Sequence, residues 1–205
     1  MKILRFGWLL GFFLPMLVQG QGEGTFDILS ENVTSYRSYN SMSQVVQSND
    51  GSVIVGWRSA RQGVPYNSIF LQKVDKTGKK IWEKDGTPLC PFSANQANFS
   101  MVSDGFGGVV VIWEDYRFGN EKPSIYAQRI NLRGEPLWGR DGARICESKA
   151  PQRKPRVISD LNNGFYMVWE DARAGINESD LYGQHLDLGG RLRWMKTGMP
   201  ICTSP

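Results

Sequence analysis

The sequence predicts an all-β protein made of three tandem four-stranded units that follow an N-terminal signal peptide. Three observations support this. Tryptophans and other residues recur every 56 positions, each period holds four short β-patterned segments separated by turns, and no segment has a convincing 3.6-residue apolar period. A four-stranded sheet with two apolar faces needs a neighbour on each face. The units are therefore most simply blades of a β-propeller, in an open or incomplete ring.

Residues 1–20 have the pattern of a secretory signal peptide. Lys2 and Arg5 precede an uncharged apolar run from Phe6 to Val18, and Gln19-Gly20 supplies modest or small residues near a cleavage site. The apolar run is shorter than the roughly 20 residues that cross a bilayer. We expect an exported protein, located outside the cell, on its surface or in the periplasm, with no membrane span after signal removal. The alternative is an uncleaved membrane anchor.

The composition excludes several classes of function. The chain has 205 residues with 24 Lys+Arg, 20 Asp+Glu, one His and three Cys, and its formal net charge is +4. Loss of Lys2 and Arg5 with the signal reduces the net charge to +2. Such a balance gives no electrostatic argument for nucleic-acid binding. One His and three Cys leave little room for a zinc site, so we expect no metal and no cofactor.

The period of 56 residues is visible in seven sets of identical residues. These sets are Trp57, Trp113 and Trp169; Trp82, Trp138 and Trp194; Cys90, Cys146 and Cys202; Gln72, Gln128 and Gln184; Arg61, Arg117 and Arg173; Gly78, Gly134 and Gly190; and Gly86, Gly142 and Gly198. The matches contain no gap, so they predict three blades at residues 38–93, 94–149 and 150–205. Residues 21–37 form an N-terminal segment, in which residues 24–34 align with the last strand of a blade.

The second unit shows the expected strands most clearly. We predict strands over residues 99–103, 109–113, 124–131 and 136–139. The second of these (VVVIW) is a continuous β-branched run, which is typical of a strand covered on both faces. Residues 104–108 form a glycine-rich reversal, residues 114–123 a polar loop and residues 132–135 a turn.

The unit also resembles the tandem DG-x-GG-x-x-x-x-W-x-D-x-R … Y-x-Q-R … G-x-x-x-W repeats of secreted bacterial proteins, many of them from Bacteroidota. The matching residues are Asp104, Gly105, Gly107, Gly108, Trp113, Asp115, Arg117, Tyr126, Gln128, Arg129, Gly134 and Trp138. The resemblance covers residues 38–205. It implies a propeller fold and says little about activity, because most of these proteins are uncharacterised.

Three blades are fewer than the four to eight that typically close a propeller. We therefore expect this chain to be the N-terminal part of a longer, truncated propeller. The alternative is a homo-oligomer that completes the propeller, for instance two chains that together supply six blades.

The candidate site residues follow the second strand of two units. They are Glu114, Asp115 and Arg117, and Glu170, Asp171 and Arg173. Paired carboxylates could act as acid and base on a glycosidic bond, and arginine could hold a carboxylated sugar. The first unit has Ser59 and Arg61 here and lacks both acids. Catalytic residues are normally single, so we predict no catalytic residue and favour ion pairs that brace each loop. Ligand binding by these six residues on the loop face is the second interpretation.

Three further sets of residues have structural interpretations. Asp104 and Asp160 precede glycine-containing turns and are expected to shape the reversal after the first strand. The three cysteines occupy equivalent positions on different blades, beyond the roughly 7 Å Cα limit for a disulfide, so we expect partly buried free thiols. His185 replaces the Lys73 and Arg129 of the other units and is expected to be a polar face residue.

The predicted function follows from the loops. Residues 58–67, 114–123 and 170–179, together with 84–97 and 140–153, should open on one face, with varied composition on a constant frame. This favours a binding or scaffolding module for a protein or carbohydrate ligand, without catalysis in this stretch. The alternative is a fragment of a carbohydrate-active propeller enzyme, a hydrolase or lyase whose catalytic residues lie mostly in other blades. A purely structural domain of a surface protein also fits the sequence.

Overall fold

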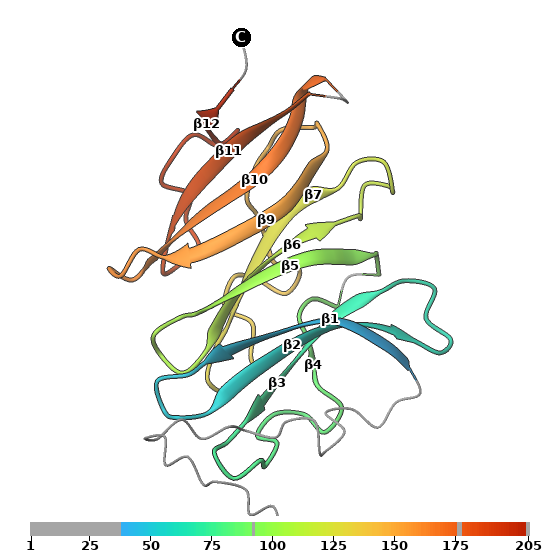
Figure 1. Cartoon of the computed structure of the whole chain (residues 1–205), viewed down its shortest axis with the longest axis vertical. Coiled ribbons are helices and arrows are strands. Elements are labelled where there is room, and N and C mark those ends of the chain that lie inside the picture. Colours follow the sequence, from blue (N-terminus) through green and yellow to red (C-terminus); the bar gives the residue numbers. More distant parts are fainter. Residues whose placement is uncertain (1–37, 92, 176–177, 204–205) are drawn as a thin grey trace, which may run out of the picture.

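The computed structural model describes residues 38–91, 93–175 and 178–203. Within them the chain forms three four-stranded antiparallel sheets and no helix, which confirms the all-β prediction. The signal peptide at residues 1–20 and the segment at 21–37 lie outside the described residues. Figure 1 shows the sheets stacked face to face without closing into a ring.

Each sheet lies within one of the 56-residue ranges, and its strands are ordered as they occur in the chain. The first sheet contains β1 (Ser38–Gln47), β2 (Val53–Arg61), β3 (Ser68–Val74) and β4 (Thr87–Pro88). The second contains β5 (Gln96–Ser103), β6 (Val109–Asp115), β7 (Ser124–Ile130) and β8 (Ala143–Arg144). The third contains β9 (Gln152–Ser159), β10 (Gly164–Gly175), β11 (Glu178–Asp187) and β12 (Met199–Cys202).

The core lies between the sheets, and β6 shows how the sequence fills it. Every residue of β6 is buried, as the run of β-branched residues predicts. Val111 and Trp113 join the apolar cluster shared with the first sheet. Val110 and Ile112 point the other way, into the cluster shared with the third sheet. One strand therefore supplies both interfaces, because successive side chains leave opposite faces of a sheet.

The fourth strand differs from the prediction. Residues 136–139 form only an isolated bridge between Ile130 and Pro136, and the strand that pairs with β7 is β8. The reason is that a side chain replaces the backbone ladder at this point. Gln128 Oε1 accepts the backbone N–H of Trp138 at 2.8 Å, which frees the tryptophan ring to pack into the core.

Two predicted loops also differ from the structure. Glu114 and Asp115 belong to β6 rather than to the polar loop, because both residues pair with β5 and with β7, and both are buried. In the third sheet β10 continues to Gly175 and β11 begins at Glu178, so most of the expected loop 170–179 is strand.

One face of the third sheet is much more exposed than its equivalents. Val168 and Leu181 are 40% and 43% exposed, whereas Ile112 and Ile125, 56 residues earlier, are fully buried. The second sheet is covered here by the third, and no further sheet covers the third among the described residues.

Candidate functional site

A tryptophan, an aspartate and an arginine form a closed polar group at the end of β6. Asp115 Oδ2 accepts hydrogen bonds from Trp113 Nε1 at 2.9 Å and from Arg117 Nη2 at 2.8 Å. Asp115 Oδ1 accepts one from Arg117 Nε at 2.7 Å. The carboxylate is completely buried, so these charge-assisted bonds replace its hydration. We call this arrangement the Trp–Asp–Arg clamp.

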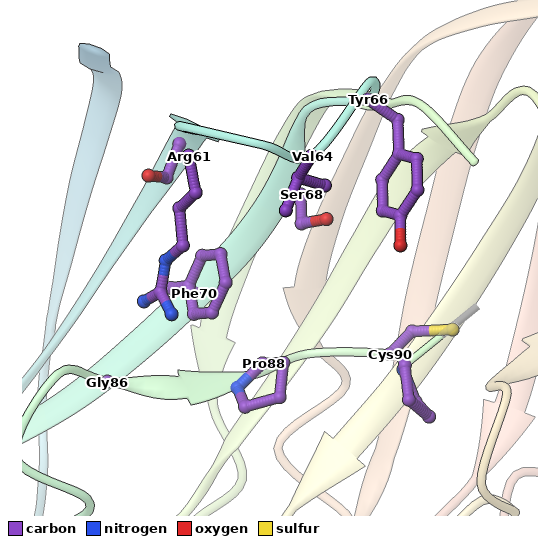
Figure 2. A pocket seen from close by; sticks show the side chains of 10 residues that line it. Arg61, Val64, Tyr66, Ser68, Phe70, Gly86, Pro88 and Cys90 are labelled. Carbon is purple, nitrogen blue, oxygen red and sulfur yellow. The ribbon is translucent and has the colours of Figure 1, made fainter. Parts of the chain in front are cut away.

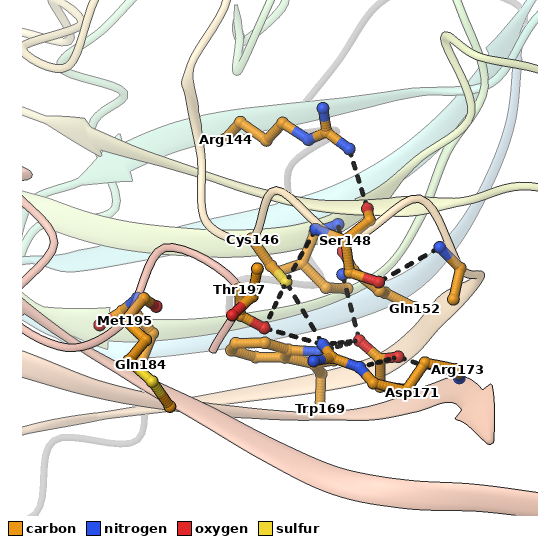
Figure 3. A network of polar contacts seen from close by, with 12 residues as sticks. Arg144, Cys146, Ser148, Gln152, Trp169, Asp171, Arg173, Gln184, Met195 and Thr197 are labelled. Atoms are coloured by element: carbon orange, nitrogen blue, oxygen red, sulfur yellow. Dashed lines mark hydrogen bonds and ion pairs between the residues drawn. The ribbon is translucent and has the colours of Figure 1, made fainter. Parts of the chain in front are cut away.

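The third sheet repeats the clamp with residues 56 positions later (Figure 3). Asp171 accepts hydrogen bonds from Trp169 Nε1 at 3.2 Å and from Arg173 Nε at 2.8 Å. Arg173 Nη2 also donates to the backbone oxygen of Thr197 at 2.8 Å. The hydrogen bond to Asp171 raises the pKa of Arg173 above its ordinary value. The interpretation of these Asp–Arg pairs as braces is confirmed.

The two glutamates lie in a different environment. Glu114 is buried between sheets, where Oε1 accepts bonds from Asn98 Nδ2 at 2.8 Å and from the backbone N–H of Lys154 at 2.7 Å. Its Oε2 accepts the Tyr116 hydroxyl at 2.8 Å. Burial, reinforced by this bond, raises the pKa of Tyr116 to about 12. Lys154 Nζ forms an ion pair with the half-buried Glu170 at 3.0 Å.

The six predicted site residues therefore occupy two clamps and one group between sheets, rather than a single shared cavity. Their contacts are made within the chain. A ligand-binding role for them stays a prediction.

The first sheet retains the clamp without its acid. Ser59 occupies the position of Asp115 and Asp171, while the tryptophan and arginine are kept as Trp57 and Arg61. Among the described residues the buried Trp57 Nε1 and Ser59 Oγ have no hydrogen-bond partner. Arg61 Nη2 donates to the backbone oxygen of Asp85 at 2.7 Å, and its guanidinium lies 3.5 Å from the centre of the Phe70 ring.

A cavity of about 290 Å³ opens beside Ser59 (Figure 2). It is lined by Ser59, Arg61, Val64, Tyr66, Ser68, Phe70, Gly86, Pro88, Cys90 and Pro91. The position of Pro88 holds Arg144 in the second sheet and Pro200 in the third. The longer Arg144 reaches toward the Phe118 ring and donates to the backbone oxygen of Ser148 at 3.0 Å. We call this cavity the Ser59 pocket.

Sequence reasoning missed the Ser59 pocket, although its signal was visible. The first unit departs from the repeated acids, and from the sequence alone this departure argues only against catalysis. The same departure lies at the cavity, together with Pro88, which stands where the second sheet has Arg144 and the third has Pro200.

The reversals predicted at Asp104 and Asp160, after the first strands of the second and third units, are confirmed. Asp104 Oδ1 accepts the backbone N–H groups of Phe106 and Gly108, each at 2.8 Å. Asp160 makes the equivalent contacts in the third sheet, and its Oδ2 lies 2.7 Å from His185 Nε2. This hydrogen bond with His185 lowers the pKa of Asp160.

The three cysteines are free thiols. Cys90 and Cys146 are buried, each beside the clamp arginine of the following sheet, with Sγ to Nη2 distances of 3.8 and 3.7 Å. Burial raises the pKa of the Cys146 thiol. Cys202 is exposed rather than partly buried, since no described sheet follows it.

The described part of the chain contains no group of three or more His, Cys, Asp or Glu residues placed to hold a metal ion. Nor do these residues include a helix long and apolar enough to cross a membrane.

No protein-family model matches the sequence, and no curated protein matches it. Among solved structures, a protein of unknown function from Dyadobacter fermentans matches 78% of this chain and 55% of its own, with a TM-score of 0.55 and 13% identity. An endo-1,5-α-L-arabinanase from Thermotoga petrophila matches 80% and 42%, with a TM-score of 0.45 and 15% identity. A GH43 endo-arabinanase from Bacillus licheniformis matches 80% and 59%, with a TM-score of 0.45 and 12% identity.

The chain thus spans about half the length of these proteins. At such identities the likeness concerns the fold alone. The chain has a β-propeller-type fold of three four-stranded sheets that do not close into a ring.

Proposed function

We propose that the chain is an exported β-propeller module that binds a carbohydrate at the loop edge of its sheets and does not catalyse a reaction in this stretch. The observation that carries the proposal is the Ser59 pocket, a concave site at the loop edge of the first sheet. Its volume of about 290 Å³ matches a site for a sugar-sized group. A protein partner usually binds a broad, flat surface instead.

The internal use of the repeated acids supports binding over catalysis. A general acid or base must reach the proton that it transfers. Asp115 and Asp171 are fully buried inside clamps, and Glu114 is fully buried between sheets. This proposal includes three further points: export of the chain, its organisation as tandem repeats, and completion of a ring by further blades or by a homo-oligomer.

Affinity electrophoresis combined with a reducing-end assay tests the proposal. The protein is run through gels containing arabinan, xylan, pectin or mucin glycans, and the same mixtures are assayed for released reducing ends. We expect at least one gel to retard the protein without any release. Val64→Lys places a charged chain at the mouth of the pocket and should abolish the retardation at an unchanged melting temperature.

The opposite result would support the alternative function. Release of reducing ends by the wild-type protein, lost in Glu170→Gln without loss of folding, would identify a carbohydrate-active enzyme. Absence of retardation in every gel would contradict carbohydrate binding.

A further inference from the structure

We propose that a second pocket, beside Trp194 in the third sheet, binds a sugar residue of a short glycan or of the end of a longer one. The cavity has a volume of about 440 Å³, and its lining includes Asp160, Asn163, His185, Asp187, Arg193 and Trp194. We call it the Trp194 pocket. It lies at the turn before β10, whereas Ser59 lies near the far end of the equivalent strand β2. The two pockets are therefore separate, and this proposal does not depend on the Ser59 pocket.

The surroundings of Trp194 depart from the repeat, although all three sheets share the tryptophan. Four positions hold an aromatic ring or an added polar side chain in the third sheet alone. They are Tyr166 (Ile54 and Val110 in the first and second sheets), Asn163 (Gly51 and Gly107), His185 (Lys73 and Arg129) and Arg193 (Ile81 and Leu137). Asn163 keeps the left-handed backbone of the glycines, with a φ of +63°, which a non-glycine residue adopts only at a cost.

The aromatic rings beside the pocket form one packed group. The rings of Tyr166 and His185 are stacked, with centroids 4.5 Å apart and an interplanar angle of 27°. The half-buried Trp194 ring lies 5.8 Å from Tyr166 and 6.0 Å from His185. This packing fixes His185 and Trp194, the two rings that line the pocket. The C–H face of a sugar ring can pack against an aromatic wall of this kind.

Charged side chains supply the hydrogen-bonding groups of the pocket. Asp160 Oδ2 lies 2.7 Å from His185 Nε2, and Asp187 Oδ2 lies 3.0 Å from Arg193 Nη2. A carboxylate accepts hydrogen bonds from hydroxyl groups, and a guanidinium donates to them. Because each acid is already paired with a basic side chain, the pocket favours neutral hydroxyl groups over a charged ligand.

The other two sheets show which kind of atom the tryptophan at this position binds. Trp82 Nε1 donates to the backbone oxygen of Leu132 at 3.0 Å, and Trp138 Nε1 donates to that of Leu188 at 3.1 Å. Both oxygens belong to the sheet that follows. No described sheet follows the third one, and no described residue accepts a hydrogen bond from Trp194 Nε1. A hydroxyl oxygen of the ligand would take the place of that backbone oxygen.

The indole N–H signals of ¹⁵N-labelled protein test the proposal, with the Trp194 signal assigned by Trp194→Phe. The probes are arabinose, xylose, galactose and N-acetylglucosamine, titrated one at a time, and glycerol is the control for weak polyol binding. We expect at least one sugar to move the Trp194 signal to a plateau, while the signals of Trp82 and Trp138 stay in place. Glycerol at the same concentration should move none of the three.

Two variants restore residues that the second sheet carries at the same positions. Arg193→Leu removes a donor and Tyr166→Val removes the ring that packs against His185. Each should weaken sugar binding by about fivefold or more at an unchanged melting temperature. Arg191→Leu is the matched control, because Arg191 is exposed and lies outside the pocket lining, and it should keep the full response.

A third variant keeps the test valid if these two do not fold. Asn163→Gly returns the glycine of the other sheets, so it should melt no lower than the wild type and bind sugar more weakly. A Trp194 signal that no sugar moves would overturn the proposal. So would a signal that moves with protein concentration instead of with sugar, because the pocket would then be a contact between copies of the chain.

Failure of this proposal is distinguishable from failure of the proposed function. A gel polysaccharide offers few chain ends, so retardation reports on the Ser59 pocket and the free sugars report on the Trp194 pocket. If Val64→Lys abolishes retardation but no sugar moves the Trp194 signal, the proposed function stands and the Trp194 pocket falls. If a sugar moves that signal but no gel retards the protein, the Trp194 pocket stands and binding at the Ser59 pocket falls.

Discussion

One residue of the clamp distinguishes the first sheet from the other two: the position after the tryptophan and before the arginine holds serine instead of aspartate. Trp57 and Arg61 match their counterparts in the other sheets, and only Ser59 replaces the acid. An aspartate there would be a buried charge with three donors in reach, whereas serine leaves two buried polar atoms without partners. The difference of one side chain therefore removes the carboxylate that braces the other two clamps.

The clamp makes a testable contribution to stability. Asp115→Asn removes the charge opposite Arg117, whose side chain is itself only 8% exposed. Breaking a buried pair by removing one partner costs about 3–5 kcal/mol, and we expect a loss of that size in urea denaturation. Glu135→Gln is the control, because its pair with Arg133 is exposed to solvent and should contribute little to stability. Equal losses in both variants would contradict a structural role for the clamp.

The Asp160–His185 contact predicts an acid dependence of stability. The hydrogen bond with His185 depresses the folded-state pKa of Asp160. The resulting stabilisation is present above the unfolded-state pKa of about 3.9 and is lost as the pH falls through the lower, folded-state pKa. Asp160→Asn keeps an acceptor for the turn but removes this titration. We therefore expect its free energy of unfolding to fall less steeply below about pH 4 than that of the wild type.

His185→Gln is the companion variant in this experiment. It removes the partner that holds the pKa of Asp160 down, so the acid slope should again become shallower. An acid slope identical to that of the wild type in both variants would rule out this pair as its source.

The candidate site was only partly predictable from the sequence at this scale. The Asp–Arg braces were predictable because both residues are close in sequence and repeat. The Ser59 pocket was not, because Ser59, Phe70 and Pro88 come from three different strands. Only the pairing of β2, β3 and β4 brings them together.

At the scale of elements, the second and third strands were predictable and the fourth was not. The apolar run of β6 and the alternation of apolar and polar residues in β7 are local sequence patterns, so each predicts its strand directly. The fourth segment was misplaced because Gln128, from the neighbouring strand, accepts the Trp138 backbone N–H at 2.8 Å. A side chain that replaces a ladder bond leaves no periodicity for a strand prediction to detect.

The turn after each third strand shows how one sheet docks on the next. Trp82 Nε1 donates to the backbone oxygen of Leu132 at 3.0 Å, and Trp138 Nε1 to that of Leu188 at 3.1 Å. Beside these contacts the tryptophan rings lie against Gly134 and Gly190, both in the left-handed region. Glycine is needed here for its conformation and for the close approach of the ring.

Two alanine variants separate these two requirements. Gly78 and Gly190 have φ values of +86° and +79°, but a Cβ at Gly190 would lie 2.8 Å from Trp138 Cγ, and a Cβ at Gly78 would meet nothing within 4 Å. Gly78→Ala should cost about 1–2 kcal/mol in urea denaturation for the left-handed backbone. Gly190→Ala should cost about 1–3 kcal/mol more, because the indole must shift. Equal costs would show that the ring contact contributes nothing.

At the scale of the whole molecule, the 56-residue period repeats an interface as well as a strand pattern. The face of β6 and β7 that packs against the third sheet recurs on β10 and β11, where it is exposed. Sequence periodicity could predict this face, because its residues occupy the positions that are buried in the preceding sheet.

The exposed face predicts behaviour in solution. Contiguous apolar surface promotes association, so the chain should self-associate or bind a hydrophobic dye. Val168→Lys should reduce dye binding without loss of stability, because Val168 is 40% exposed. Ile112→Lys, at the equivalent buried position, should destabilise the fold strongly. A dye-silent monomer, measured by fluorescence and light scattering, would contradict an open stack of sheets.

The central claim is that the Trp–Asp–Arg clamps of the second and third sheets are internal braces. It is tested most directly by the indole N–H signals of ¹⁵N-labelled protein, with each signal assigned by a Trp→Phe variant. We predict that the indole N–H groups of Trp113 and Trp169, which donate to buried aspartates, exchange with deuterated water more slowly than that of Trp57, which has no hydrogen-bond partner among the described residues. Equal exchange rates at the three indoles would contradict the claim.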